Sequence, residues 1–590
     1  MEEKWVLVRK GADFKALGEE LDVDPVLVRI LRNRGMHTAG EMRAFLYGGK
    51  ELLHDPHLLR DADRAAELLL KKIREKKKIR IIGDYDIDGI MATYILLQGL
   101  LKLGADADTA IPDRILDGYG LNEHLITQAK ESGADTILTC DNGIAAYKQI
   151  RYAKEAGMTV IVTDHHEVPF TETDGKREYR LPPADAVVDP KRPDETYPFD
   201  GICGAAVAYK LIRILYEKAG IPADEADVFL EYAGFATVGD VMDLQDENRV
   251  LVKLGLQALN RTQNLGMRTL IARNKIEAGQ VRAYHIGFRI GPCLNASGRL
   301  ETAEKSLRLL QTRDIMEAVP LAEEICTLNE TRRDMTQQAA QEAVRIIRTE
   351  GYERDKVLVV YLADCHESLA GIVAGRLREA YNRPALVITH GEHGAKGSGR
   401  SIEAYSMYEE LGRCKELFTK FGGHPMAAGF SLPEENIPVL RQRLNALTRL
   451  TDADLVPKVR IDVDLPIDYL SEQLVEELSL LEPCGKGNER PVFAQRNLIL
   501  RGLKVFGQKR NVIRLDVESP GGRRMNAVYF CDERTVLDQL ARAYGPDWES
   551  RMSAAEPENI VRVHLCYYPE IDDYRGNASL QLKVQHLLAG

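Results

Sequence analysis

Three clusters of carboxylates and imidazoles in this chain of 590 residues have the composition of a metal site. Residues 84–89 read Asp-Tyr-Asp-Ile-Asp-Gly, with carboxylates at alternate positions, and residues 141–143 read Asp-Asn-Gly. Residues 164–166 read Asp-His-His. Carboxylate oxygens combined with imidazole nitrogens suit Mn²⁺, whereas Mg²⁺ prefers oxygen ligands and water. These residue types therefore predict a site for divalent cations.

Each cluster also has a purely structural interpretation. An EF-hand calcium loop begins with alternating acids, but it needs a glutamate at its twelfth position, where this chain has Ile95. A solvated acidic turn is the other alternative for residues 84–89, and a helix cap or tight turn is the alternative for Asp141. Asp240, in the pair Gly239-Asp240, is explained by a helix cap at least as well as by metal binding.

Each cluster follows a short apolar run that has the length of a buried strand. The three runs are residues 78–82, 134–140 and 159–162, and helix-length segments such as 90–103 and 145–156 separate them. Apolar strands that alternate with helices predict a parallel, doubly wound α/β sheet. Because such sheets bind ligands at the carboxyl ends of their strands, we expect the three clusters to converge on one site.

A mostly helical N-terminal segment is expected over residues 1–75, followed by the first α/β domain over residues 76–300. The rest of the chain is expected to add three further parts. The charged, helix-prone stretch 301–350 predicts one long connecting helix. A smaller α/β domain with glycine-rich turns is expected over 351–452. Several short strands with polar turns in 453–590 predict a small β-barrel such as an OB-fold.

Composition limits the possible classes of protein. The net charge of −11 argues against a general polyanion binder, although a local basic channel can exist on an acidic body. The nine cysteines include no Cys-x-x-Cys pair, which suits a reducing cytosol. The N-terminus lacks the apolar core of a signal peptide, and no apolar run is long enough to span a bilayer. We therefore expect a cytoplasmic protein without a membrane partner.

The motif order resembles that of the DHH phosphoesterase superfamily. The three clusters followed by Gly239-Asp240 match its four motifs in order, and residues 422–430, Gly-Gly-His-Pro-Met-Ala-Ala-Gly-Phe, resemble its DHHA1 partner domain. Within the superfamily the chain is similar to the bacterial RecJ exonucleases from about residue 50 onward. The segments that carry this similarity are 112–114, 117–122, 295–299 and 482–488. Around His366, the residues Cys365, Ser368 and Leu369 depart from the RecJ pattern.

This resemblance implies a single-stranded-DNA-specific 5′→3′ exonuclease that releases 5′-mononucleotides in DNA repair and recombination. It implies two divalent cations, Mn²⁺ or Mg²⁺, between which water is activated. Single-stranded DNA with a 5′ end is the expected partner, together with a single-strand-binding protein and a helicase, and the protein is expected to be a monomer.

Six residues are assigned as metal ligands, with Asp141 bridging the two ions. Asp164 is expected to orient a histidine from outside the ligand set, and the resemblance places His166 and Arg299 at the scissile phosphate. The ligands of one ion are Asp84, Asp86 and Asp141, and those of the other are Asp88, Asp141, His165 and Asp240.

The resemblance also implies a pocket for the 5′-phosphate between the two α/β domains. Arginine supplies a planar fork of donors for phosphate oxygens, and an aromatic ring can stack on any base. Surface solubility is the alternative role for each of the basic residues. The pocket candidates are Arg114, Ser398 and Arg400, with His424 near the phosphate, Tyr119 for base stacking, and Lys504, Lys509 and Arg510 as backbone contacts in the barrel.

Two other functions remain open. Another DHH hydrolase, such as an oligoribonuclease, a cyclic-dinucleotide phosphodiesterase or a family II pyrophosphatase, usually lacks the C-terminal barrel. The pyrophosphatases also typically begin their first motif with histidine where Asp84 stands. A binding protein with an inactive site would have lost motif residues, whereas all of the acids and both histidines are present here.

Overall fold

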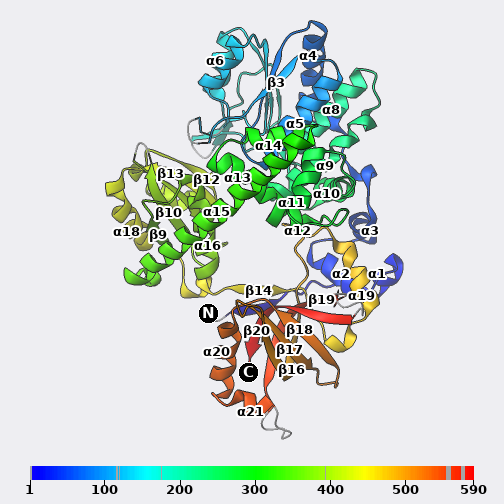
Figure 1. Ribbon diagram of the computed structural model, residues 1–590, viewed down its shortest axis with the longest axis vertical. Coiled ribbons are helices and arrows are strands. Elements are labelled where there is room, and N and C mark those ends of the chain that lie inside the picture. Colours follow the sequence, from blue (N-terminus) through cyan, green and yellow to red (C-terminus); the bar gives the residue numbers. More distant parts are fainter. Residues whose placement is uncertain are drawn as a thin grey trace. The chain divides into compact units, whose positions relative to one another are not determined.

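The computed structural model describes residues 3–114, 117–118, 120–173, 176–391, 394–552, 560–572 and 579–590. The chain forms two compact units (Figure 1). One unit is Gly49–Pro457, and the other combines the segment up to Gly48 with Lys458–Gly590. Among the described residues, no helix is long and apolar enough to cross a membrane.

A five-stranded parallel sheet is the centre of the first α/β domain. Its strand order is β3-β2-β4-β5-β8, and every neighbouring pair is parallel. The predicted strands that end at the three motifs are therefore confirmed as neighbours. Their bounds are β2 (Ile79–Ile82), β3 (Ala107–Ala110), β4 (Thr136–Cys140), β5 (Thr159–Thr163) and β8 (Ala186–Val188).

Helices cover both faces of this sheet, because successive side chains of a strand point to opposite sides. Ile81 packs with α4 (Ala62–Arg74), α5 (Ile87–Lys102) and α8 (Gly204–Lys218) on one face. Its neighbour Ile82 packs with α6 (Glu123–Glu131) and α7 (Tyr147–Glu155) on the other. A small antiparallel hairpin, β6 (Phe170–Thr173) with β7 (Lys176–Tyr179), follows β5. The doubly wound architecture is thus as predicted.

A helical layer follows β8 and leads into the connecting helix. The prediction of a single helix over 301–350 is wrong in one respect, because two helices, α14 and α15, occupy this stretch. The break lies at residues 312–314, where the Asp314 carboxylate accepts a hydrogen bond from the Met316 amide and caps α15. The elements are α9 (Leu230–Gly239), α10 (Asp246–Leu259), α11 (Leu265–Arg273), α12 (Ala283–His285), a π-helical turn η4 (Ile286–Ile290), α13 (Gly291–Leu300), α14 (Glu304–Gln311) and α15 (Ile315–Thr349).

The second α/β domain contains a mixed five-stranded sheet of order β12-β13-β11-β10-β9. Only β9 and β10 run parallel, and α16 crosses between them. The other pairs are antiparallel. The elements are β9 (Leu358–Tyr361), α16 (Ala370–Tyr381), β10 (Ala385–Gly391), β11 (Gly394–Arg400), α17 (Met407–Gly412), β12 (Lys420–His424), β13 (Ala427–Leu432) and α18 (Ile437–Leu447).

The second unit is a closed β-barrel, as predicted, because β16 pairs with both β17 and β19. The helices in the C-terminal part of this unit contact its strands. The elements are β14 (Lys458–Ile461), β15 (Val463–Asp464), α19 (Glu472–Leu478), β16 (Phe493–Phe506), β17 (Val512–Glu518), β18 (Arg524–Tyr529), α20 (Glu533–Tyr544), α21 (Trp548–Met552), β19 (Arg562–Asp572) and β20 (Ser579–Ala589).

The N-terminal segment belongs to this barrel unit up to Gly48. Strand β1 (Lys4–Leu7) pairs in parallel with β14, and the helices α1 (Phe14–Leu21), α2 (Pro25–Asn33) and α3 (Ala39–Tyr47) share the barrel's hydrophobic core. Arg34 follows α2 and donates to the Asn488 side chain and the Glu489 carbonyl. Residues 49–75, in contrast, join the first α/β domain.

Candidate metal centre and phosphate pocket

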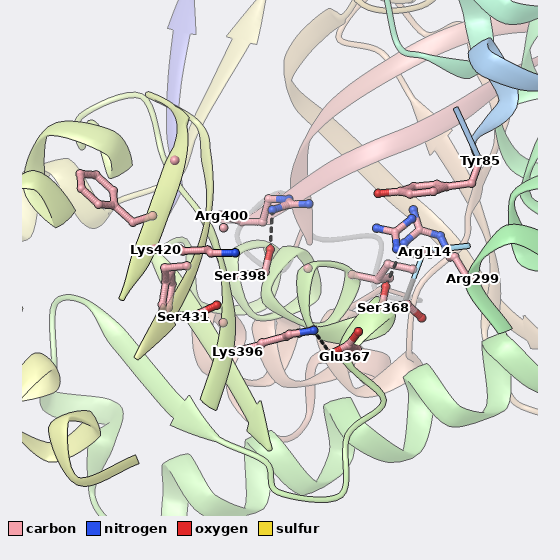
Figure 2. A pocket seen from close by; sticks show the side chains of 18 residues that line it. Tyr85, Arg114, Arg299, Glu367, Ser368, Lys396, Ser398, Arg400, Lys420 and Ser431 are labelled. Carbon is pink, nitrogen blue, oxygen red and sulfur yellow. Dashed lines mark hydrogen bonds and ion pairs between the residues drawn. The ribbon is translucent and has the colours of Figure 1, made fainter. Parts of the chain in front are cut away.

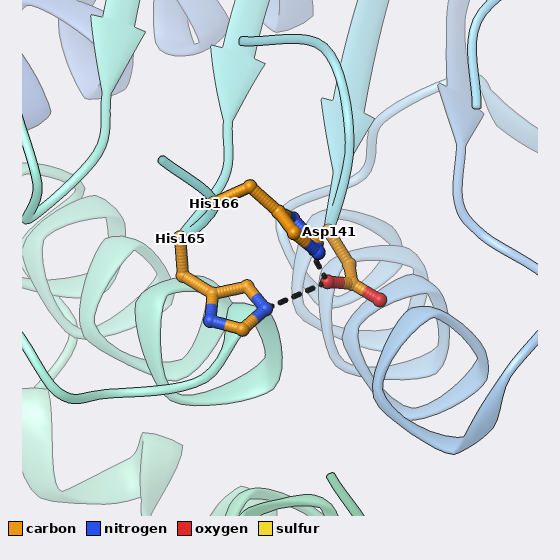
Figure 3. A group of neighbouring side chains, drawn as sticks. All are labelled: Asp141, His165 and His166. Carbon is orange, nitrogen blue, oxygen red and sulfur yellow. Dashed lines mark ion pairs between the residues drawn. The ribbon is translucent and has the colours of Figure 1, made fainter. Parts of the chain in front are cut away.

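The three motifs meet at the carboxyl ends of β2, β4 and β5. Figure 3 shows Asp141, at the end of one strand, facing the two histidines that follow its neighbour. Asp240, at the end of α9, joins the cluster from the helical layer. In each of three groups, one ligand atom per residue lies within 4.8 Å of the others. The groups are Asp84, Asp86 and Asp141; Asp88, His165 and Asp240; and Asp141, His165 and His166.

The acidic loop is held by the beginning of helix α5. Asp86 is the N-cap of this helix, and its Oδ1 accepts hydrogen bonds from the amides of Asp88 and Gly89. Asp88 lies in the first turn, buried in the protein. The cap and the helix thus place Asp86 and Asp88 next to the strand end.

The first turn of helix α8 also contributes to the site, through backbone groups that the sequence interpretation missed. The amides of Gly204 and Ala205 donate to the two oxygens of Asp88 at 2.6 and 2.8 Å. A Cβ at Gly204 would lie only 2.8 Å from the Cβ of Asp141. The α8 terminus therefore points positive N–H groups at the carboxylates, and glycine permits the close approach. The sequence signal was the run of small residues, Cys-Gly-Ala-Ala, at 203–206.

Asp141 has an unusual backbone conformation, with φ of 58°. Aspartate tolerates this left-handed region better than most residues do. The following Asn142 is buried, and its Nδ2 donates to the carbonyls of Ile82 and Cys140 at 3.0 and 2.9 Å. Asn142 thus ties the ends of β2 and β4 together beneath the cluster.

Asp164 holds His166. Its Oδ1 lies 2.7 Å from His166 Nδ1, and its Oδ2 accepts the Ile144 amide at 2.9 Å. Although burial opposes it, the hydrogen bond and charge of Asp164 raise the pKa of His166 to about 9. This contact supports the prediction that Asp164 orients a histidine, and it identifies that histidine as His166.

The cluster has an excess of buried negative charge. Burial, then the neighbouring carboxylates, raise the pKa of Asp84, Asp141 and Asp240 well above the usual range. Neither oxygen of Asp84 accepts a hydrogen bond of ordinary geometry in the described part of the chain, and His165 Nδ1 is buried without one. Burial also lowers the pKa of His165, which favours the neutral form that binds metals. These donors therefore fit divalent cations.

A basic cavity of about 460 Å³ lies next to the acidic loop (Figure 2). Tyr85 and the predicted residues Arg114 and Arg299 enter it from one side, and the predicted Ser398 and Arg400 from the other. Its lining includes one acid, Glu367, which pairs with Lys396 at 2.7 Å. The five basic side chains that line it are Arg114, Arg299, Lys396, Arg400 and Lys420.

The arginines of the cavity are oriented by short contacts. Arg400 Nη1 donates to Ser398 Oγ at 3.0 Å, and Arg299 Nη1 donates to the Ser368 carbonyl at 2.9 Å. The Arg114 guanidinium lies 4.6 Å from the centre of the Tyr85 ring. A cavity surface with this excess of positive charge suits an anion such as phosphate.

Other predicted residues are placed differently. His424 is exposed on β12 and does not line the cavity, and Tyr119 lies outside the described residues. In the barrel, Lys504 and Lys509 are exposed, whereas Arg510 forms an ion pair with Glu533. The sequence interpretation missed the cavity residues Tyr85, Lys396 and Lys420, although alternation along strands β11 and β12 could have indicated the two lysines.

Three segments of the chain match known domain families. Residues 78–238 match the DHH family, N-terminal domain, and residues 354–449 match the DHHA1 domain. Residues 461–586 match the RecJ OB domain. These segments coincide with the two α/β domains and the barrel.

Similar proteins cover most of the chain. The single-stranded-DNA-specific exonuclease RecJ of Salmonella typhimurium is 32% identical over an alignment of 613 positions that covers 100% of both chains. The protein of the same name in Bacillus subtilis is 36% identical over 88% of this chain. This chain spans only 64% of the length of that relative. The crystal structure of Thermus thermophilus RecJ in complex with Mn²⁺ has a TM-score of 0.80 at 28% identity, over 99% of this chain and 79% of the other. The chain therefore belongs to the RecJ family of metal-dependent DHH exonucleases.

Proposed function

We propose that this protein degrades single-stranded DNA from its 5′ end and releases 5′-mononucleotides. The observation that carries the proposal is the continuity of two sites. Tyr85 lines the basic cavity, and its neighbours Asp84 and Asp86 belong to the acidic cluster. A phosphate bound in the cavity would thus lie close to the phosphodiester that the cluster acts on.

In the proposed mechanism, Asp141 is shared between two sets of ligands. Asp84 and Asp86 lie with Asp141 in one set. Asp88, His165 and Asp240 form the other, and Asp141 would join it because Asp141 Oδ1 lies 3.0 Å from His165 Nε2. Two divalent cations bound there would stabilise the attacking and leaving oxygens of the phosphodiester.

The chain's own cations would act on the same phosphate. His166, whose pKa is raised to about 9, is protonated near neutral pH and can donate a hydrogen bond to a phosphate oxygen. Arg299 would bind another oxygen, because its guanidinium lines the cavity beside the acidic loop.

The direction of degradation would come from binding of the terminal phosphate. Arg114, Ser398 and Arg400 would hold the 5′-phosphate, so that the first internal phosphodiester meets the metal ligands and one nucleotide leaves in each cycle. The barrel would bind the strand through Lys504 and Lys509. The names of the RecJ relatives, which specify single-stranded DNA, support this substrate.

The proposed place of action is the cytoplasm, in DNA repair and recombination. There the protein would work as a monomer on single strands exposed by a helicase and covered by a single-strand-binding protein. None of the nine cysteines, all of which lie in the described part of the chain, forms a disulfide, and this agrees with a reducing compartment.

A time course on end-labelled single strands tests this function. With Mn²⁺ or Mg²⁺, a 5′-label should appear at once as mononucleotide, while a 3′-label should pass through progressively shorter strands. A duplex of the same sequence should be degraded slowly. Preferential hydrolysis of dinucleotides over long strands would instead favour the alternative function, an oligoribonuclease or a cyclic-dinucleotide phosphodiesterase.

A further inference from the structure

Two thiols face each other behind the acidic loop. Cys293 lies on α13 and Cys326 on α15, and their Sγ atoms are 4.0 Å apart. Both are reduced. Cys293 is buried, whereas Cys326 is only partly buried and can be reached from solvent.

Two side-chain amides and one backbone carbonyl contact this pair, and the Cys293 thiol itself donates to the Arg289 carbonyl at 3.2 Å. Asn329 Nδ2 lies 3.4 Å from Cys293 Sγ, and Asn274 Nδ2 lies 3.7 Å from both sulfurs. Arg332 donates to Asn329 Oδ1 at 3.1 Å and fixes that amide. The Cys326 thiol has the largest effect on Cys293, and although burial opposes the shift, the thiol and these amides lower the pKa of Cys293 to about 7. A thiolate stabilised in this way is the reactive form of cysteine.

Helix α13 connects the thiols to the proposed catalytic site. Asn295 Oδ1 accepts the Ile87 amide at 3.0 Å, within the acidic loop. A Cβ at Gly298 would lie 2.3 Å from the Tyr85 carbonyl oxygen, so the helix touches that loop directly. Arg299, at the end of the helix, lines the basic cavity. A displacement of α13 would therefore move both the acidic loop and the cavity.

We propose that Cys293 and Cys326 are a peroxide-reactive dithiol, and that their oxidation to a disulfide ties α13 to α15 and reduces nuclease activity. The Cys293 thiolate attacks one oxygen of hydrogen peroxide and becomes a sulfenic acid, and the departing hydroxide takes up a proton to form water. The Cys326 thiol then attacks the Cys293 sulfur, and the sulfenic hydroxyl leaves as water with the thiol proton. Two thiols and one peroxide give one disulfide and two waters.

Formation of the disulfide would disturb the site, because the bond is shorter than the present distance between the two sulfur atoms. A disulfide bond is about 2.05 Å long, so the two sulfurs would have to approach each other by roughly 2 Å. A misplacement of about 1 Å in a catalytic site can reduce turnover on the order of 100-fold. The expected loss of activity, unlike the cross-link itself, rests on the proposed nuclease function.

The cross-link can be detected without an activity assay. The full-length protein is treated with hydrogen peroxide in EDTA, quenched with catalase, alkylated and digested with trypsin. The two cysteines fall in different tryptic peptides, Ile290–Arg299 and Asp314–Arg332. We expect these peptides as a disulfide-linked pair that dithiothreitol separates. The pair should be lost in Cys326→Ser and in Cys293→Ala, but not in the control Cys531→Ser, whose partly buried cysteine lies in the barrel unit.

Activity on single-stranded DNA provides the second measurement. After peroxide, turnover should fall by at least about tenfold in the wild type and in Cys531→Ser, and dithiothreitol should restore it. Cys326→Ser should keep its activity. Absence of the linked peptides, or equal loss of activity in Cys326→Ser, would overturn the proposal. A reduced protein without nuclease activity would instead refute the proposed function, and the peptide analysis would still decide whether the dithiol reacts.

Discussion

His165 Nε2 lies 3.0 Å from Asp141 Oδ1, although 24 positions separate the two residues in the chain. The contact arises because β4 and β5 are parallel neighbours, in register from Thr136 with Thr159 onward. Residues that follow the two strands therefore meet at one edge of the sheet. His165 Nε2 is also 3.4 Å from Asp88 Oδ2, so this pair lies where the two proposed ion sites adjoin.

Replacement of Asp141 should abolish hydrolysis. In Asp141→Ala the shared ligand of both ions is lost, and turnover should fall by more than about 100-fold, because even groups outside the ligand set typically account for 10–100-fold. Binding of single-stranded DNA should remain measurable by fluorescence anisotropy. Asp106→Ala, which removes an exposed carboxylate of the same domain, serves as the control. Normal turnover in Asp141→Ala would exclude the bridging role.

The pair Asp164 and His166 should give the protein a defined pH dependence. In Asp164→Asn the pKa of His166 should fall from about 9, and turnover should decrease by about 10–100-fold. Since the raised pKa belongs to the folded state, the stabilisation by protonated His166 is complete below about 6.5 and is lost as the pH rises through about 9. The stability difference between wild type and variant, measured by urea unfolding in EDTA, should therefore shrink between pH 6 and pH 10. A constant difference would contradict this assignment.

Without metal ions, the acidic cluster should make the folded protein less stable as the pH rises. The raised pKa values of Asp84, Asp141 and Asp240 mean that the folded state binds protons at a pH where the unfolded chain has released them. Relative to Asp84→Asn, the wild type in EDTA should therefore lose unfolding free energy as the pH rises from about 5 to 8. Saturating Mn²⁺ should raise the melting temperature of the wild type more than that of the variant. If the unfolding free energies of wild type and Asp84→Asn changed with pH in parallel in EDTA, the raised pKa values of the cluster would be contradicted.

Removal of the Arg400 guanidinium should weaken recognition of the 5′-phosphate. In Arg400→Ala the preference for 5′-phosphorylated over 5′-hydroxyl strands, measured as a ratio of kcat/KM values, should fall by about 10–100-fold, the usual effect of losing a hydrogen bond to a charged group. Arg413→Ala is a matched control, because this exposed arginine of the same domain pairs with Glu410 and does not line the cavity. An unchanged ratio in Arg400→Ala would remove the residue from the pocket.

The exposed lysines of the barrel should contribute to the salt dependence of DNA binding. For single strands each neutralised phosphate adds about 0.7 to the slope of log K against log salt concentration. Lys504→Gln with Lys509→Gln should therefore reduce the slope by up to about 1.4. Lys15→Gln, which changes an exposed side chain of helix α1 in the same unit, should leave the slope unchanged. An unaltered slope in the double variant would exclude these contacts.

The sequence by itself determined the type of fold and the members of the cluster. Apolar runs of strand length that end at acidic motifs were sufficient to predict a doubly wound sheet, and the rule that ligands bind at strand ends placed Asp84, Asp141 and His165 together. The alternation of short strands and polar turns predicted the barrel. These features depend on local pattern, which a sequence displays directly.

Only the tertiary structure decided which groups touch. It paired Asp164 with His166, aimed the α8 amides at Asp88, and joined the N-terminal helices to the barrel. It also brought the Sγ atoms of Cys293 and Cys326 to a distance of 4.0 Å from each other. These contacts depend on how elements far apart in the chain pack against each other, and such packing follows from the shape of whole surfaces rather than from the spacing of residues.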